Sequence, residues 1–168
     1  VMIDSLVRYQ EKAKTTTILE DLGLSTSDYI VMTMHRPANV DTKEGLESIL
    51  ELIELSSKDT KIIFPIHPRT RAHMEKFGLA ERLDQAQNLI MTEPLGYLEF
   101  IQLMSNATAI LTDSGGIQEE TTYLGVPCLT FRDSTERPMR RLNILRLLCC
   151  RSTVDTGAGS GGHLREFE

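Results

Sequence analysis

The stretch "TAILTDSGGIQEETTYLGVPCLTF", residues 108–131, decides the fold of this chain. It begins with an apolar run at 108–112, turns at two glycines into a helical stretch, and ends in a second apolar run at 127–131. A strand, a helix and a strand in this order form the repeating unit of a parallel sheet that is covered by helices. The stretch therefore predicts an α/β fold.

The same alternation extends over the part of the chain that precedes this stretch. Three earlier apolar runs have the length of strands, at residues 29–34, 61–66 and 88–92. Their nearly continuous apolar content is typical of strands that are buried on both faces. Amphipathic stretches predict helices through 3–14, after Asp41, and at 69–78, 97–106 and 116–125. We therefore expect a Rossmann-like, three-layer fold in which helices flank a parallel sheet.

Local signals predict where some of these helices begin and end. Asp41, with Glu44 three residues later, resembles a capping box at the start of the helix between the first two strands. Gly78 and Gly125 each close a helical stretch, where a left-handed residue commonly ends a helix.

Composition indicates one globular domain followed by a different terminal segment. The chain has 168 residues, 40% of them hydrophobic and 25% charged, and no apolar run reaches the ~20 residues of a membrane-spanning helix. We expect residues 1–138 to form the domain. Residues 139–168 predict a helix from Leu142 to about Cys150 and then a flexible glycine-rich end.

Charge and cysteine content restrict the partners and the compartment. A net charge of −6 and a pI near 5.3 argue against a general nucleic-acid binder, which needs clustered Lys and Arg. Nothing near the N-terminus resembles a secretory signal. The three cysteines, Cys128, Cys149 and Cys150, form an odd set that is typical of reduced thiols. We expect a soluble, cytoplasmic protein that binds neither nucleic acid nor membranes.

Polar and cationic side chains follow the predicted strands. Right-handed crossovers make all strands of such a sheet point the same way, so their carboxyl ends share one edge, where ligands bind. His35 and Arg36 follow the first strand, and His67 follows the second. "DSGG" (113–116) follows the fourth strand, and the segment after the fifth contains Arg137. We expect these groups to converge on one site.

The turn at 114–116 has two interpretations. Its glycines let backbone N–H groups approach an anion directly, and the dipole of the following helix favours negative charge there. Glu119 and Glu120, about one turn later, would then accept hydrogen bonds from the hydroxyls of a ribose. In the structural alternative, Asp113 or Ser114 caps the helix and the glutamates are surface residues favoured by the dipole.

The other candidate residues also have structural interpretations. Each histidine could be an exposed loop residue without a role. A zinc site is disfavoured, because no two of its possible ligands share one element at the required spacing. Those ligands would be His35, His67, His73 and Asp113. Tyr97 and Phe100 fit the core-facing side of their helix, although a ring near the loop could instead stack on a base.

Four longer motifs occur in order along the chain. They are "MTMHRPANVD" (32–41), "FPIHPRT" (64–70), "EPLGYLEFIQLM" (93–104) and "ILTDSGGIQEETTYLGVPCLTFRDSTERP" (110–138). Together they resemble the C-terminal half of non-hydrolysing UDP-N-acetylglucosamine 2-epimerases. The resemblance covers most of the chain from about residue 29 to residue 138. It implies one half of a glycosyltransferase-B-like architecture, with UDP bound by this domain.

The resemblance also implies roles for individual residues. The corner at 114–116 would hold the diphosphate of UDP, Glu120 the ribose hydroxyls, and Phe100 would border the uracil. His35 would be catalytic. The residues implied to contact UDP or the sugar nucleotide are Arg36, His67, Phe100, Ser114, Gly115, Gly116, Glu120 and Arg137.

The implied activity is an isomerase reaction that interconverts UDP-N-acetylglucosamine and UDP-N-acetylmannosamine by eliminating UDP and adding it back. It consumes no metal and no other cofactor. In the family, an N-terminal domain that is absent from this sequence completes the active site, and the full-length enzymes are implied to be homodimers that supply cell-surface polysaccharide synthesis. Two alternatives stay open: a UDP or UDP-sugar binding fragment without catalysis, and the donor-binding domain of a glycosyltransferase.

Overall fold

The computed structural model describes residues 2–131 of the chain. Its helices are α1 (Met2–Ala13), α2 (Ile18–Asp21), α3 (Pro37–Val40), α4 (Lys43–Ser56), α5 (Pro68–Lys76), α6 (Ala80–Asp84), α7 (Tyr97–Asn106) and α8 (Gly115–Leu124). Its strands are β1 (Tyr29–Thr33), β2 (Lys61–Pro65), β3 (Leu89–Thr92), β4 (Ala109–Thr112) and β5 (Cys128–Thr130). The predicted helix and glycine-rich end within 139–168 lie outside the described residues, as do Arg137, Cys149 and Cys150.

The strands form one parallel sheet with the order β3-β2-β1-β4-β5. Every strand end lies within one residue of the end of the apolar run that predicts it. From β1 the chain proceeds to β2 and β3 on one side of the sheet, whereas β4 and β5 extend the other side. The order therefore reverses between β1 and β4, and the predicted parallel α/β fold is confirmed.

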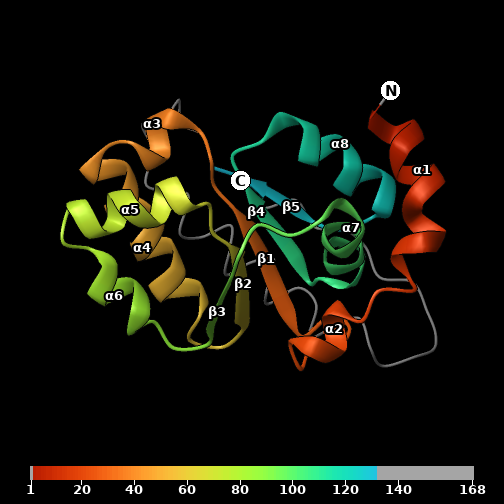
Figure 1. Ribbon diagram of the computed structural model, residues 1–168, viewed down its shortest axis with the longest axis horizontal. Coiled ribbons are helices and arrows are strands. Elements are labelled where there is room, and N and C mark those ends of the chain that lie inside the picture. The colour runs from red at the N-terminus through yellow and green to blue at the C-terminus, as the bar shows by residue number, and fades with distance from the viewer. Residues whose placement is uncertain (1, 132–168) are drawn as a thin grey trace, which may run out of the picture. The chain divides into compact units, whose positions relative to one another are not determined.

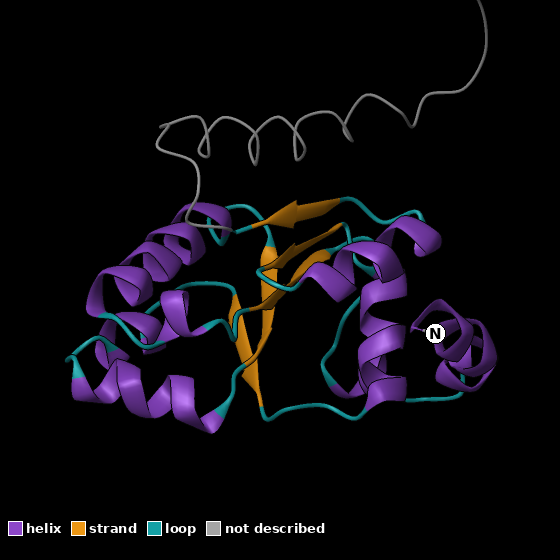
Figure 2. Ribbon diagram, turned by 90° about the horizontal axis from the view of Figure 1, so that it is seen from above, coloured by secondary structure: helices purple, strands orange, loops and turns teal. Residues whose placement is uncertain are grey.

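Helices cover both faces of this sheet, as Figure 1 and Figure 2 show. α3, α4, α5 and α6 lie on one side, and α7, α8, α1 and α2 lie on the other (Figure 1). α1 is outermost in its layer and packs against α7 and α8. Leu6 and Ala13 of α1 form a small buried cluster with Ile101 of α7. This is the three-layer arrangement that the alternation of strands and helices predicts.

Burial differs between the inner and the outer strands. β1, β2 and β4 contribute fully or almost fully buried side chains, such as Ile30, Ile62 and Ile110. All residues of β3 and β5 keep some exposure, because each of these strands has a single partner strand within residues 2–131. The prediction of burial on both faces is right for the three inner strands and wrong for the two outer ones.

The glycines predicted to end two helices do so, but the predicted capping box does not start α4. Gly78 and Gly125 have φ of 70° and 69°, the left-handed conformation that was expected after α5 and α8. The N-cap of α4 is Thr42 instead of Asp41, and its hydroxyl accepts a hydrogen bond from the N–H of Gly45 at 3.1 Å. The Asp41 carboxylate instead pairs with Arg69 of α5 at 2.5 Å.

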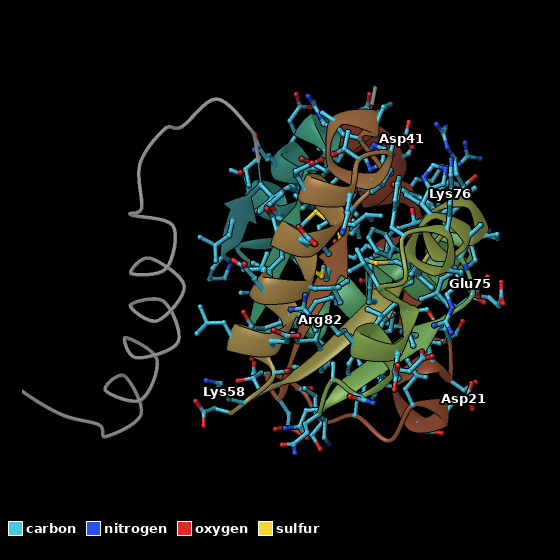
Figure 3. The ribbon with its side chains drawn as sticks, turned by 90° about the vertical axis from the view of Figure 1, so that its left-hand side faces the viewer. Asp21, Asp41, Lys58, Glu75, Lys76 and Arg82 are labelled. Atoms are coloured by element: carbon cyan, nitrogen blue, oxygen red, sulfur yellow. The ribbon has the colours of Figure 1, made fainter. Side chains whose placement is uncertain are left out.

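Three short helices, α2, α3 and α6, lie in stretches where the sequence predicts no element, since four or five residues are too few to show a helical period. α3 packs very closely on α4. A Cβ atom at Gly45 would collide with the backbone carbonyls of Ala38 and Asn39. α4 then runs from this contact to the opposite end of the layer, so that Asp41 and Lys58 lie at its two ends (Figure 3).

Candidate functional site at the ends of β1 and β4

The candidate site lies at the point where the strand order reverses. Thr33, the last residue of β1, pairs with Thr112, the last residue of β4. Open α/β sheets bind ligands beyond the carboxyl ends of the strands at such a point. His35 and Asp113 follow these two strand ends, and the structure brings them into contact.

The carboxylate of Asp113 holds the loop that follows β1. It is fully buried. Its Oδ2 accepts hydrogen bonds from the backbone N–H of His35 at 3.0 Å and of Arg36 at 2.8 Å, and from the side-chain amide of Asn39 at 3.0 Å. Its Oδ1 lies 3.0 Å from Nδ1 of His35, whose side chain is 60% exposed. The imidazole is therefore anchored on one side and accessible on the other.

Thr112 connects this loop to the turn after β4. Its Oγ1 lies 2.8 Å from Oγ1 of Thr33 and accepts a hydrogen bond from the N–H of Ser114 at 3.0 Å. Because both contacts involve one hydroxyl, the first residue of the turn is fixed with respect to the end of β1. The two loops that carry the candidate residues thus share a rigid base.

The start of α8 has no side-chain cap. Ser114 is the N-cap residue, with φ −90° and ψ 131°, but its hydroxyl makes no capping hydrogen bond. The acceptors of Asp113 are occupied by the loop at 35–39. Both forms of the capping alternative are therefore wrong. The first amides of α8, beginning with Gly115 and Gly116, have no side-chain acceptor among residues 2–131.

Glu119 and Glu120 of α8 have different environments. Glu119 is exposed, whereas Glu120 is only 5% exposed. The hydroxyl of Tyr97 donates a hydrogen bond to Oε1 of Glu120 at 3.3 Å. Burial raises the pKa of Glu120, and the hydrogen bond from Tyr97 opposes this rise. A buried carboxylate near the uncapped start of a helix is thus available as an acceptor to a ligand that displaces Tyr97.

The remaining candidate residues make contacts within the fold. Nδ1 of His67 accepts a hydrogen bond from the N–H of Arg69 at 3.2 Å, so this histidine caps α5. Phe100 is half-buried against the core cluster that contains Tyr29. The side chain of Arg36 is exposed. Arg137 is outside the described residues, so its predicted contact stays a prediction.

Two residues, Asp113 and Tyr97, have a larger part in the site than the sequence predicts. The sequence predicts Asp113 as one of the groups at the strand ends, as a helix cap or as a disfavoured zinc ligand, yet this carboxylate organises the His35 loop. Its place directly after a fully buried strand that neighbours the "HR" strand end is a signal for that contact. Tyr97 is predicted to be a core or base-stacking residue, but its side chain is 41% exposed and its hydroxyl donates a hydrogen bond to Glu120.

The described part of the chain shows neither a metal-binding cluster nor a membrane-spanning helix. Residues 2–131 contain no group of three or more His, Cys, Asp or Glu side chains placed to hold a metal ion. Of the four residues of the disfavoured zinc site, His35 and Asp113 are in contact, whereas Nδ1 of His73 lies 2.8 Å from the carbonyl oxygen of Val40 and His67 caps α5. None of the described helices combines the length and the apolar character that crossing a membrane requires.

Solved structures define the class of fold. A Methanocaldococcus jannaschii UDP-GlcNAc 2-epimerase, in complex with UDP-GlcNAc and UDP, superimposes with a TM-score of 0.74 and 35% identity, over 89% of this chain and 45% of that one. The heptosyltransferase WaaC of E. coli shares the fold alone, with a TM-score of 0.50 and 13% identity, over 80% of this chain and 46% of that one. The described domain is one half of a glycosyltransferase-B-like fold.

Sequence comparison gives the family. The profile described as UDP-N-acetylglucosamine 2-epimerase matches residues 1–156, so the chain belongs to this family. A UDP-N-acetylglucosamine 2-epimerase homolog of Methanococcus maripaludis is 47% identical over 138 residues, which are 81% of this chain and 38% of that protein. The chain thus spans well under half the length of this relative.

Proposed function

We propose that this chain is the nucleotide-binding half of a UDP-N-acetylglucosamine 2-epimerase. The whole enzyme would interconvert UDP-N-acetylglucosamine and UDP-N-acetylmannosamine. Removal of the C2 proton and cleavage of the bond from C1 to the diphosphate oxygen would release UDP, and protonation of the opposite face of C2 would precede the return of UDP to C1. The observation that carries the proposal is the uncapped start of α8 beside a histidine that Asp113 holds.

The diphosphate would bind at the start of α8. Gly115 and Gly116 offer backbone N–H groups there, Ser114 offers its hydroxyl, and the helix dipole favours an anion. The diphosphate gains negative charge as it leaves the sugar, so donors that are already oriented stabilise the transition state more than the bound substrate. The contact of Thr112 with the N–H of Ser114 supports such a fixed orientation.

The nucleoside would bind along α7 and α8. In this proposal, Glu120 accepts hydrogen bonds from the ribose hydroxyls, and Phe100 of α7 borders the uracil. The proximity of the two helices is supported by the hydrogen bond from Tyr97 to Glu120 at 3.3 Å. The ribose would replace Tyr97 as a donor to the buried carboxylate, which would then keep its hydrogen bonds on binding.

His35 would act on the reacting end of the sugar nucleotide. Its side chain is exposed and lies one strand away from the diphosphate corner. Arg36, His67 and Arg137 would contribute further donors to the substrate. We also propose the family context that the sequence suggests: a cytoplasmic, homodimeric enzyme of cell-surface polysaccharide synthesis, in which an N-terminal domain completes the active site.

A second candidate function is UDP binding without turnover by this chain. It is favoured by one observation, the coverage of only 38% of the Methanococcus maripaludis relative. The diphosphate corner and Glu120 both lie within the described domain, so this chain itself carries the groups proposed to hold the diphosphate and the ribose. Turnover, in contrast, needs groups that move the C2 proton. These groups would lie in the part of the related proteins that this chain does not match.

Calorimetric titration of this chain with UDP tests the binding step. Glu120→Gln should weaken binding roughly 10- to 100-fold, because hydrogen bonds to a charged group contribute about 1.5–3 kcal/mol. Glu44→Gln is the control, since Glu44 is an exposed glutamate in the first turn of α4, on the other side of the sheet, and its affinity should equal that of the wild type. Equal affinities of all three proteins would remove Glu120 from the site, and the absence of UDP binding would refute the proposed function.

Proton NMR then separates the two candidate functions. The chain is incubated with UDP-N-acetylglucosamine, and the anomeric region is followed for the manno epimer. Epimer formation by the chain would contradict the need for a further domain. Binding without epimer supports the nucleotide-binding half, and turnover on addition of a separately produced N-terminal domain of a relative would support the whole-enzyme reaction.

A further inference from the structure

We propose that Asp113 is a positioning residue for His35, which fixes the imidazole in the tautomer with its proton on Nδ1 and leaves Nε2 for the sugar nucleotide. The proposal concerns the geometry of the histidine and rests on the proposed function for its meaning, because His35 is the residue assigned to the reacting end of the ligand.

The chemistry of the two groups decides which atom carries the proton. Oδ1 of Asp113 lies 3.0 Å from Nδ1 of His35, a hydrogen-bond distance. An ionised carboxylate can only accept, so Nδ1 must donate. A neutral imidazole has a single N–H, and Nε2 on the far side of the ring then carries a lone pair. The 60% exposure of the ring leaves that side open to a ligand.

Asp113 is itself buried and held by several hydrogen bonds, which makes it suited to orient another group. Its Oδ2 receives three hydrogen bonds at 2.8–3.0 Å, from the backbone of His35 and Arg36 and from the amide of Asn39. These donors lie on one oxygen and hold the loop. The shortest contact of Oδ1 is with the imidazole ring, since the N–H of His35 is farther from it, at 3.2 Å. The backbone N–H donors and Asn39 account for the structural role of Asp113, and the contact of Oδ1 with the imidazole is additional to that role.

The fixed tautomer suits either direction of proton movement. Neutral His35 can take a proton on Nε2, and the carboxylate of Asp113 compensates the positive charge that then appears on the ring. The protonated ring can donate from Nε2 to the diphosphate oxygen that leaves C1. In Ser-His-Asp sites an aspartate plays this orienting part, and its replacement by asparagine gives the wrong tautomer.

The tautomer of His35 can be measured in the ¹⁵N-labelled chain by long-range ¹H–¹⁵N NMR, at a pH well above the ordinary histidine pKa of about 6.5. The chain has four histidines, and His35→Gln assigns the signal of His35 by its loss. We expect Nδ1 of wild-type His35 to show the shift of a protonated nitrogen and Nε2 that of an unprotonated one.

Asp113→Asn should exchange these two shifts. The amide oxygen would keep the place of Oδ2, where three donors converge, and the NH₂ group would face Nδ1. Nδ1 must then accept, and the proton moves to Nε2. Asp28→Asn is the matched control, because the Asp28 carboxylate pairs with Lys61 at 3.2 Å near the other end of β1, and the variant should keep the wild-type shifts.

A wild-type His35 with its proton on Nε2 would overturn the proposal, and so would a folded Asp113→Asn variant with unchanged shifts. If that variant fails to fold, the wild-type tautomer still decides, together with Asn39→Ala, which removes a donor to Oδ2 and should keep the proton on Nδ1.

Addition of UDP to the wild-type sample separates the two proposals. Unchanged amide signals of Gly115 and Gly116 would refute the proposed function, whereas the tautomer of His35 is measured without UDP.

Discussion

The hydroxyl of Tyr97 on α7 donates a hydrogen bond to the carboxylate of Glu120 on α8, at 3.3 Å. Tyr97 is 41% exposed and Glu120 is 5% exposed, so the tyrosine covers the carboxylate from the solvent side. Tyr97 is in turn held by an edge contact with Tyr9 of α1, with ring centroids 6.1 Å apart. α1, α7 and α8 thus meet around a buried acidic group.

Replacement of Tyr97 by Phe should raise the pKa of Glu120 further. Burial is the main cause of the raised pKa, and the hydrogen bond from Tyr97 lowers it by stabilising the charged form. The variant removes the second effect and keeps the ring. Carboxyl ¹³C NMR gives the titration of Glu120, with Tyr123→Phe as control, because Tyr123 is an exposed tyrosine of α8. Identical titration curves for Tyr97→Phe and the wild type would contradict the assigned contact.

Glu120→Gln should change how stability depends on pH. The folded state holds a proton on Glu120 more tightly than the unfolded state, whose pKa is close to 4.5. The stability that this group contributes is therefore present below the unfolded pKa and is lost as the pH rises through the folded pKa. The variant should lose this decline and be more stable than the wild type at neutral pH. Urea unfolding over a pH series measures the difference, and parallel curves for both proteins would show that Glu120 is not responsible.

The fold can be predicted from the sequence because buried strands appear as short apolar runs and long helices as amphipathic stretches. The run at 108–112 and the glycine at 125 each predict a feature that the structure has, since buried parallel strands are apolar throughout and left-handed residues are usually glycine. The outer strands β3 and β5 have the same apolar content but are less buried. Position in a sheet is a property of topology, which a single run of residues does not encode.

Gly45→Ala should destabilise the domain by about 1–3 kcal/mol, the usual cost of overpacking. Alanine gains up to ~1 kcal/mol in helix propensity, but the new Cβ meets the backbone carbonyls of Ala38 and Asn39, which cannot move aside as a side chain would. The collision should therefore exceed the gain. Urea denaturation measures it, with Ser48→Ala in the same helix as a control expected within ~0.5 kcal/mol of the wild type. A stabilised Gly45→Ala would show that α3 does not pack on α4 this closely.

The candidate site was predicted less completely than the fold, and Asp113 shows why. The sequence places this residue correctly at a strand end, but its partners are up to 78 residues away in the chain. Helix capping is a local interaction and is the natural first interpretation of an Asp before "SGG". The choice between capping its own helix and bonding the neighbouring loop depends on the pairing of β1 with β4. The capping box predicted at Asp41 is wrong in a similar way: Thr42 is the N-cap, and the Asp41 carboxylate pairs with Arg69 of another helix.

Tyr29→Phe should reduce stability by about 1 kcal/mol, the usual contribution of one buried hydrogen bond. The Tyr29 side chain is fully buried in β1, burial raises its pKa, and its hydroxyl donates to the carbonyl of Leu103 at 2.7 Å. Leu103 lies in the last turn of α7, where carbonyl groups lack partners within the helix. The N–H of Ala107, which would be its helical partner, donates to Met104 instead.

The phenylalanine variant keeps the ring and leaves that carbonyl without a donor in a buried place. Guanidinium unfolding of the variant, beside exposed Tyr123→Phe as the matched loss of a hydroxyl, measures the effect of burial alone. If both variants lost the same stability, the buried hydroxyl of Tyr29 would contribute no more to the free energy of unfolding than the exposed hydroxyl of Tyr123 does. A larger loss for Tyr29→Phe ties the last turn of α7 to β1, the strand that ends next to His35, and so links the rigidity of the candidate site to a contact at the other end of the sheet.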